Sequence, residues 1–232
     1  MQRCLVTGAN RGLGLEFVRQ LLAREARVIA TARQPGHALE LNELAAAHPG
    51  RLHVLPLDVA RPASIDELAR EAEQLFDGLD LLLNNAGVLP AGERLGRLDP
   101  EQVEASFRVN ARGPLLLTEA LAGLLGRGSA PVVGNLASSV GSIARTQAFR
   151  TPSYAISKAA QNMVTRLLAA ALAERGVTVL ALNPGWVRTD MGGARAPLDP
   201  PTAVARLLQV IDAATPQRSG MFLDGDGQAL PW

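Results

Sequence analysis

Short apolar runs alternate with helical patterns along the whole chain, and this alternation constrains the fold more than any other feature. Strands are predicted at residues 3–7, 27–31, 52–57, 79–83, 132–137, 177–182 and 221–223. Helices are predicted at residues 13–24, 38–47, 64–76, 153–174 and 202–213, and a further helix begins at Pro100. We expect one doubly wound α/β domain over residues 1–232, with a mostly or wholly parallel seven-stranded sheet and helices on both faces. Ligands of such folds bind beyond the carboxyl ends of the strands.

Composition and charge argue against several classes of protein. A formal net charge of +1 without long runs of one sign gives no footprint for nucleic acid or an anionic membrane. The lone Cys4 cannot form an internal disulfide, residues 1–7 lack a signal-peptide core, and no stretch approaches 18 uninterrupted apolar residues. We therefore expect a cytoplasmic protein that binds neither nucleic acid nor membrane. His37, His48 and His53 lack metal-ligand spacing, so no metal site is expected.

A glycine-rich turn, Thr7-Gly8-Ala9-Asn10-Arg11-Gly12-Leu13-Gly14, links the first predicted strand to the first predicted helix. Glycine lets the backbone turn sharply and approach a pyrophosphate, whose charge the amides of a helix N-terminus favour. The same residues would also suit a plain turn between a strand and a helix. Their place after the first strand of a β/α chain favours dinucleotide binding.

The end of the second predicted strand indicates which dinucleotide would bind. An acidic residue there usually holds the ribose hydroxyls of NAD. This chain has Ala30-Thr31-Ala32-Arg33 instead, with no carboxylate between Arg27 and Glu40. Arg33 and Arg11 could hold a 2′-phosphate through charge-assisted hydrogen bonds, which favours NADP. The alternative is two solvated arginines in an arginine-rich protein.

The only tyrosine and the only lysine, Tyr154 and Lys158, lie four residues apart in a predicted helix. Residues at i and i+4 share one face, so a phenol and an ammonium could enter one pocket. A nearby ammonium favours the phenolate and would lower the phenol pKa from its ordinary value near 10. Because every other basic residue is arginine, compositional drift is the alternative explanation for the lone lysine.

Further motifs accompany these features: Asp58-Val59, Asn84-Asn85-Ala86-Gly87, Asn110, Ser138 and Asn183-Pro184-Gly185. Over essentially its whole length the chain therefore resembles the short-chain dehydrogenase/reductase family. Residues 184–193 and 230–232 resemble the branch of C-factor-like and sniffer-like carbonyl reductases. The resemblance implies a Rossmann-type fold and an NADP(H)-dependent oxidoreductase that reduces an aldehyde, ketone or quinone to an alcohol by hydride transfer.

The resemblance also implies roles for individual residues. Tyr154 would be the general acid/base, and Lys158 would activate it and hold the nicotinamide ribose. Ser138 would orient the substrate oxygen, with Ser139 as the alternative, and Asn110 would hold a water that links Lys158 to solvent. Asp58 could instead cap the next segment, and Asn84 and Asn85 could tie neighbouring strands together. The residues expected at the cofactor are Gly8, Asn10, Arg11, Gly12, Leu13, Gly14, Arg33, Asp58, Val59, Asn85, Ala86, Gly87, Tyr154, Lys158, Pro184, Gly185, Val187 and Thr189.

The substrate side is less defined by the sequence. We expect its pocket between residues 139–150, the region after Gly87, and a substrate loop at about residues 186–199. Arg145 and Arg150 could favour an anionic substrate, and no particular metabolite is indicated. The helix at 153–174 has more apolar positions than one stripe needs, which favours a homodimer or homotetramer. Two other functions stay open: an NADP-binding sensor or signalling protein with little catalysis, and an NAD-linked alcohol dehydrogenase.

Overall fold

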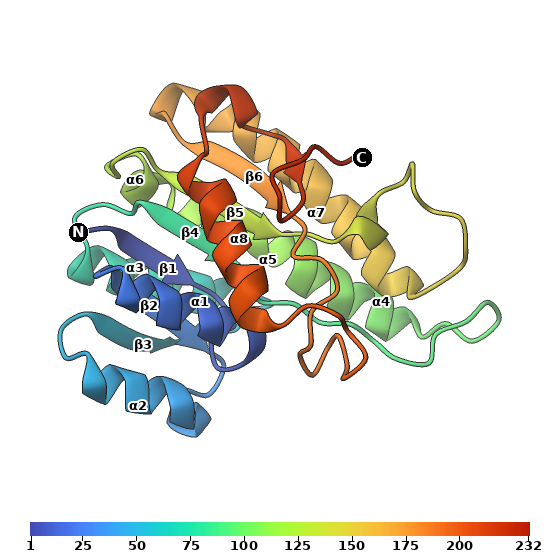
Figure 1. The fold of residues 1–232 in the computed structure, drawn as a ribbon, viewed down its shortest axis with the longest axis horizontal. Coiled ribbons are helices and arrows are strands. Elements are labelled where there is room, and N and C mark those ends of the chain that lie inside the picture. The colour runs from blue at the N-terminus through green and yellow to red at the C-terminus, as the bar shows by residue number, and fades with distance from the viewer.

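The computed structural model describes all 232 residues and alternates strands with helices from end to end (Figure 1). The strands are β1 (Arg3–Val6), β2 (Arg27–Ala32), β3 (Leu52–Pro56), β4 (Leu81–Asn84), β5 (Val132–Leu136), β6 (Thr178–Leu182) and β7 (Phe222–Leu223). The α-helices are α1 (Gly12–Ala23), α2 (Leu39–Ala47), α3 (Pro62–Leu75), α4 (Pro100–Phe107), α5 (Gly113–Ala120), α6 (Ala122–Leu125), α7 (Pro152–Ala171) and α8 (Pro200–Asp212). The predicted fold class is confirmed.

The seven strands form one sheet in the order β3-β2-β1-β4-β5-β6-β7, and every neighbouring pair is parallel. All carboxyl ends therefore lie at the same edge. Strands β2 and β3 lie on one side of β1, and β4 to β7 lie on the other side, so the strand order reverses between β1 and β4. These two strands pair through Cys4–Val6 and Leu81–Leu83. In an open parallel sheet this reversal opens a crevice for ligands.

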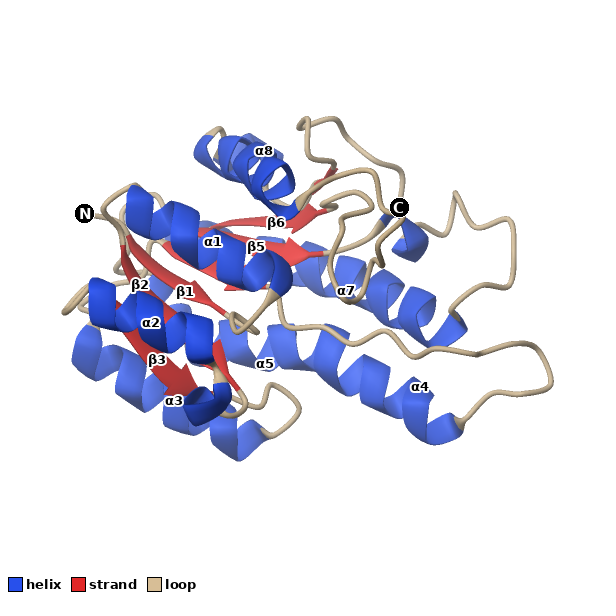
Figure 2. Ribbon diagram, turned by 60° about the horizontal axis from the view of Figure 1, so that its bottom comes forward, coloured by secondary structure: helices blue, strands red, loops and turns tan.

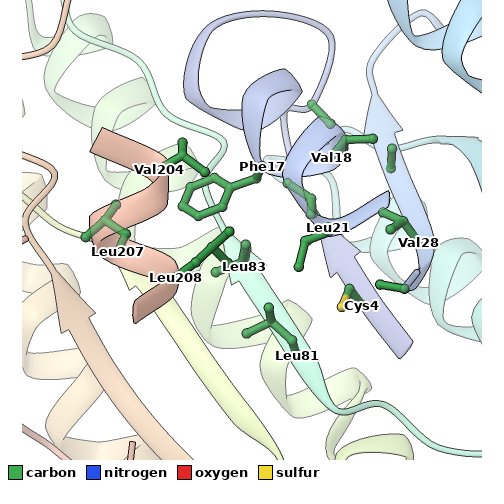
Figure 3. Close-up of a cluster of buried hydrophobic side chains, with 14 of the residues drawn as sticks. Cys4, Phe17, Val18, Leu21, Val28, Leu81, Leu83, Val204, Leu207 and Leu208 are labelled. Carbon is green, nitrogen blue, oxygen red and sulfur yellow. The ribbon is translucent and has the colours of Figure 1, made fainter. Parts of the chain in front are cut away.

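Helices cover both faces of the sheet, because side chains of a strand alternate between its two sides. In β1, Cys4 and Val6 belong to the core under α1, α2 and α8, whereas Leu5 belongs to the core under α3, α5 and α7 (Figure 2). Figure 3 shows the Phe17 ring of α1 beside Val204 of α8 in the first core. None of the helices combines the length and apolar content needed to cross a bilayer.

Two helices differ from the predictions in informative ways. The helix that begins at Pro100 changes to a π-helical turn at Arg108–Arg112 before it continues as α5. Pro114 has no N–H with which to make the α-helical bond to the Asn110 carbonyl, so the chain widens there. The helix predicted to reach residue 174 ends at Ala171, because a 3-10 turn and Gly176, at φ +69°, follow it.

Candidate active site

Side-chain hydrogen bonds tie the carboxyl ends of β1 and β4 together. The Thr7 hydroxyl accepts from the amides of Asn85 and Ala86, each at 3.0 Å, and Asn85 Nδ2 donates to the carbonyls of Thr7 and Gly8. Asn84 Nδ2 donates to Asn135 Oδ1 of β5 at 2.8 Å. Both asparagine side chains thus connect neighbouring strands, as the simpler sequence interpretation proposed. Asn85 still lines the cleft, and only the Nδ2 atom of its side chain is engaged in these bonds.

The glycine-rich turn lies directly against this junction. Gly8 has φ +61°, and a Cβ there would lie 2.9 Å from the Ala86 Cα, so no side chain fits. A Cβ at Gly14 would lie 2.4 Å from the Gly8 carbonyl oxygen, which makes Gly14 a packing residue of the turn. Helix α1 begins here with no side-chain cap and no acidic residue in its first turn. Its first N–H groups are therefore open to an anion, and the turn fits a dinucleotide pyrophosphate.

A cleft runs along the carboxyl edge of the sheet. It is lined by residues from the glycine-rich turn and from the segments after β2 to β6. Those that the sequence predicted are Gly8, Asn10, Arg11, Gly12, Leu13, Arg33, Asp58, Val59, Asn85, Ala86, Gly87, Tyr154, Lys158, Pro184 and Thr189. The fold thus brings fifteen residues from separate sequence motifs to the wall of one cleft. Each of them remains a candidate for binding the cofactor or the substrate.

One end of the cleft is rich in basic side chains. A second hollow there is lined by Asn10, Arg11, Ala32, Arg33, Gln34, His37, Asp58 and Arg61. Arg33 is exposed and no ion pair of the chain includes it, whereas Arg11 pairs with Asp190 at 2.8 Å. Asp58 accepts from the Ala60 amide through one oxygen, a local turn bond that leaves its second oxygen without a protein partner. This end of the cleft suits a phosphate.

Tyr154 and Lys158 lie at the other end, in the first two turns of α7. The Lys158 Nζ lies 5.6 Å from the centroid of the Tyr154 ring. Lys158 is only 4% exposed, and its Nζ donates to the Leu136 carbonyl and to Gln161 Oε1, at 2.9 Å for the glutamine. Both of these partners are neutral, so no carboxylate compensates the buried charge.

Burial shifts the pKa values of both residues. It raises the pKa of the Tyr154 phenol, and a hydrogen bond with Ser138 opposes that rise without cancelling it. It lowers the pKa of the Lys158 ammonium to about 7. The expectation that Lys158 lowers the Tyr154 pKa is therefore wrong for this arrangement, because burial disfavours the charged form of each group. Near neutral pH the phenol carries its proton.

Three serines follow β5, and the structure separates them. Ser138 is the one whose hydroxyl hydrogen-bonds Tyr154, while it also accepts from the Val140 amide at 3.3 Å. Ser142 is buried and donates to the Pro231 carbonyl at 2.7 Å, so its hydroxyl is already engaged. Gly141 accounts for the spacing from Ser138: a Cβ there would lie 2.7 Å from the Lys158 Cβ. Ser138 thus remains the candidate, and Ser139 has no comparable contact.

Asn110 lies within the π-helical turn and is completely buried. Its side chain pairs with the backbone of Val88, accepting from the amide at 2.8 Å and donating to the carbonyl at 2.9 Å. Its Nδ2 also donates to Ser157 Oγ, which in turn donates to the Tyr154 carbonyl. Both the Nδ2 and the Oδ1 atoms of Asn110 are therefore already hydrogen-bonded within the protein.

Some predicted residues lie beside the cleft without lining it: Gly14, Asn110, Ser138, Gly185 and Val187. Arg145 and Arg150 are exposed and line neither hollow. Further lining residues that were not predicted to contact the cofactor are Ala32, Gln34, His37, Leu57, Arg61, Val88, Val109, Leu136, Ala137, Asp190 and Met191; Asp190 and Met191 lie in the predicted substrate loop, and Val88 lies in the predicted region after Gly87. Most of them directly flank a predicted residue at a strand end, which is the one signal that could have found them.

Known proteins with matching sequences support this description. The model of the short chain dehydrogenase family matches residues 2–198. A Rhodococcus protein, 1-hydroxy-2-glutathionyl-2-methyl-3-butene dehydrogenase, is 36% identical over 100% of both chains. The C-signal protein of Myxococcus xanthus is 40% identical over 66% of this chain and 93% of its own.

Solved structures agree with the sequence relatives. NADPH-bound carbonyl reductase from chicken fatty liver is 37% identical, with a TM-score of 0.94 over 100% of this chain and 99% of its own. The carbonyl reductase Sniffer of D. melanogaster is 32% identical, with a TM-score of 0.95 over the whole of both chains. The family match, the relatives and the shared fold lead to one conclusion: this chain belongs to the short-chain dehydrogenase/reductase family of oxidoreductases.

Proposed function

We propose that this protein is an NADP(H)-dependent carbonyl reductase in which Tyr154 is the general acid/base. The observation that carries the proposal is one cleft that Tyr154 and the buried Lys158 line at one end and Arg33, which no ion pair includes, lines at the other. The NADPH in the chicken carbonyl reductase supports the choice of cofactor. The reaction converts an aldehyde, ketone or quinone to an alcohol.

Each part of the cofactor has a candidate partner in the cleft. The open amides of α1 would hold the pyrophosphate, and Arg33 with Arg61 would bind the 2′-phosphate. Val59 and Asp58 would border the adenine, and Thr189 with Pro184 would border the nicotinamide. When bound, NADPH supplies a hydride for the carbonyl carbon. The protein's own task is then to hold the carbonyl in place and to provide a proton.

The Tyr154 hydroxyl would provide that proton to the substrate oxygen. Its raised pKa keeps the phenol protonated near pH 7, as a proton donor requires. Ser138, which hydrogen-bonds Tyr154, would orient the same oxygen and stabilise the negative charge that develops on it. Lys158, with a pKa of about 7, can return a proton to the phenol after each turnover. Proton transfer by a positioned group contributes about 10²- to 10⁴-fold to the rate.

Substitution of Tyr154 tests this mechanism. Tyr154→Phe removes the proton donor and should lower kcat at least about 10²-fold across a panel of carbonyls, with the dissociation constant for NADPH unchanged within about threefold. Turnover is followed by the loss of reduced-cofactor absorbance, and cofactor binding by titration. Undiminished turnover in Tyr154→Phe would contradict the mechanism.

Substitution of Arg33 tests the cofactor assignment. Arg33→Asp replaces the guanidinium by the acid that typically binds the ribose of NAD, so it should weaken NADPH binding about 10-fold or more. Arg70→Asp, an equivalent charge change on the exposed face of α3, is the control. An unchanged preference for NADPH over NADH in Arg33→Asp would favour an NAD-linked enzyme.

Two relatives keep other functions open. The name of the Rhodococcus dehydrogenase favours oxidation of an alcohol, which would give faster turnover with the oxidised cofactor than with the reduced one. The name of the Myxococcus C-signal favours signalling. In that case NADPH would bind, but no aldehyde, ketone or quinone would cause its oxidation.

We also propose that two copies associate through α7 and α4. Ile156, Met163 and Leu167 form an exposed apolar stripe on α7, at the i, i+7, i+11 spacing of one helix face. Exposed Phe107 ends the adjacent α4. An exposed apolar stripe of this kind is typical of an interface between identical subunits.

A further inference from the structure

The first turn of α7 is held from outside the helix. Thr151, which precedes the helix, has φ +41° and ψ +54°, and its side chain makes no capping bond. This left-handed conformation is strained for a β-branched residue and persists only where neighbouring contacts maintain it. Tyr154 follows Thr151 by three residues and belongs to this first turn. The position of its phenol therefore depends on how the turn is maintained.

Glu93 supplies the missing cap. Its Oε2 accepts from the Ser153 amide at 3.3 Å, and its Oε1 accepts from the Ser153 hydroxyl. Ser153 is buried, with 1% of its surface exposed. Glu93 is the only residue from 91 to 100 that is not exposed. A carboxylate at this place satisfies a terminal N–H and interacts favourably with the positive end of the helix dipole.

The Glu93 contact completes a ring of bonds around Tyr154. Ser157 Oγ donates to the Tyr154 carbonyl at 2.7 Å and accepts from Asn110 Nδ2 at 2.9 Å. Asn110 holds both backbone polar groups of Val88, and the chain runs from Val88 to Glu93, which returns to α7 at Ser153. Without Glu93 this ring is open on the side of the strained Thr151.

We propose that Glu93 is a positioning residue for the reaction: through Ser153 it fixes the first turn of α7 and thereby the Tyr154 phenol beside Ser138. This inference rests on the proposed role of Tyr154 as proton donor. Glu93 does not line the cleft, so it acts on kcat and leaves cofactor binding unaffected. A small displacement of a reacting group is sufficient for a large loss of rate.

Glu93→Ala tests the inference in the full chain, with 4-nitrobenzaldehyde and 9,10-phenanthrenequinone as carbonyl probes. We expect kcat to fall about 10- to 100-fold, with the NADPH dissociation constant unchanged within about twofold. Glu93→Gln keeps the shape of the side chain and one acceptor oxygen, so its kcat should fall less than that of Glu93→Ala. Glu101→Ala, a substitution of an exposed glutamate in the first turn of α4, should keep the wild-type kcat.

A rescue variant separates positioning from general damage. Thr151→Gly removes the conformational strain, so Glu93→Ala/Thr151→Gly should recover part of the lost kcat. Equal kcat in Glu93→Ala and Glu101→Ala would overturn the inference, as would a parallel loss of NADPH binding. If Glu93→Ala does not fold, the same comparison is made with Glu93→Gln and Ser153→Ala, and wild-type kcat in both overturns it. Normal turnover in Tyr154→Phe would instead overturn the proposed function itself.

Discussion

Lys158 is buried beside neutral partners, and its charge therefore changes close to neutral pH. Below its pKa of about 7 the ammonium is protonated, and above it the amine is neutral. The raised pKa of Tyr154 keeps the phenol protonated through the same range. If the ammonium returns the proton to Tyr154, carbonyl reduction should be fastest below pH 7 and should decline as the pH rises through 7. Steady-state kcat between pH 5.5 and 9 checks this prediction.

Lys158→Arg provides the matched test of that pH dependence. A guanidinium stays charged at every accessible pH, but its planar fork does not fit the space of a compact ammonium. We expect kcat to fall about 10²-fold, and the residual rate should show no decline near pH 7. A wild-type pH profile in Lys158→Arg would assign the decline to another group.

Asp80 makes the free energy of unfolding depend on pH in the acid range. Burial would raise the pKa of Asp80, but hydrogen bonds from the Arg3 guanidinium and the Ser129 and Arg3 amides outweigh burial and hold it below the ordinary value. A lowered folded-state pKa adds stability above about pH 4, which is lost as the pH falls through the folded-state value. Asp80→Asn should remove that acid sensitivity and cost about 2 to 4 kcal/mol at pH 7, measured by urea unfolding.

Between elements, Gly141 determines how closely the turn after β5 packs on α7. A Cβ at this position would lie 2.7 Å from the backbone carbonyl carbon and the Cβ of Lys158, which are not flexible ends. Gly141→Ala should push α7 away, lower stability by about 1 to 3 kcal/mol and lower kcat about 10-fold. Gly123→Ala, at an exposed position of α6 where a Cβ would lie 3.6 Å from the movable tip of Arg127, should keep the wild-type kcat and stability.

The limits of sequence-based prediction are also set between elements. The positions of Gly8, Arg33 and the Tyr154–Lys158 pair at the cleft could be predicted from the sequence. Each position depends only on a strand end or a helix turn a few residues away. The contact of Gly141 with Lys158, and the pairing of Arg11 with Asp190, join segments that only the folded sheet brings together. The direction of the Tyr154 pKa shift depends on burial, which the spacing of two residues does not reveal.

For the whole molecule, the apolar stripe on α7 predicts the assembly state. Met163→Glu/Leu167→Glu places two charges in the proposed interface and should shift the protein from dimer or tetramer to monomer, as measured by light scattering. Leu39→Glu, an exposed apolar position of α2 over the opposite face of the sheet, is the control. A monomeric wild-type protein would contradict the proposed association.

The pairing of β1 with β4 also has a consequence for biosynthesis. β1 is made first and pairs on one side with β2, but its other edge is unpaired until β4 leaves the ribosome. The Gly8 turn rests on Ala86 and Asn85, so it cannot reach its final shape before then either. A nascent chain that stops at Leu75 would expose an unpaired strand edge to other chains. Ability to bind a nucleotide would therefore arise late in synthesis, after the fourth strand has joined the first.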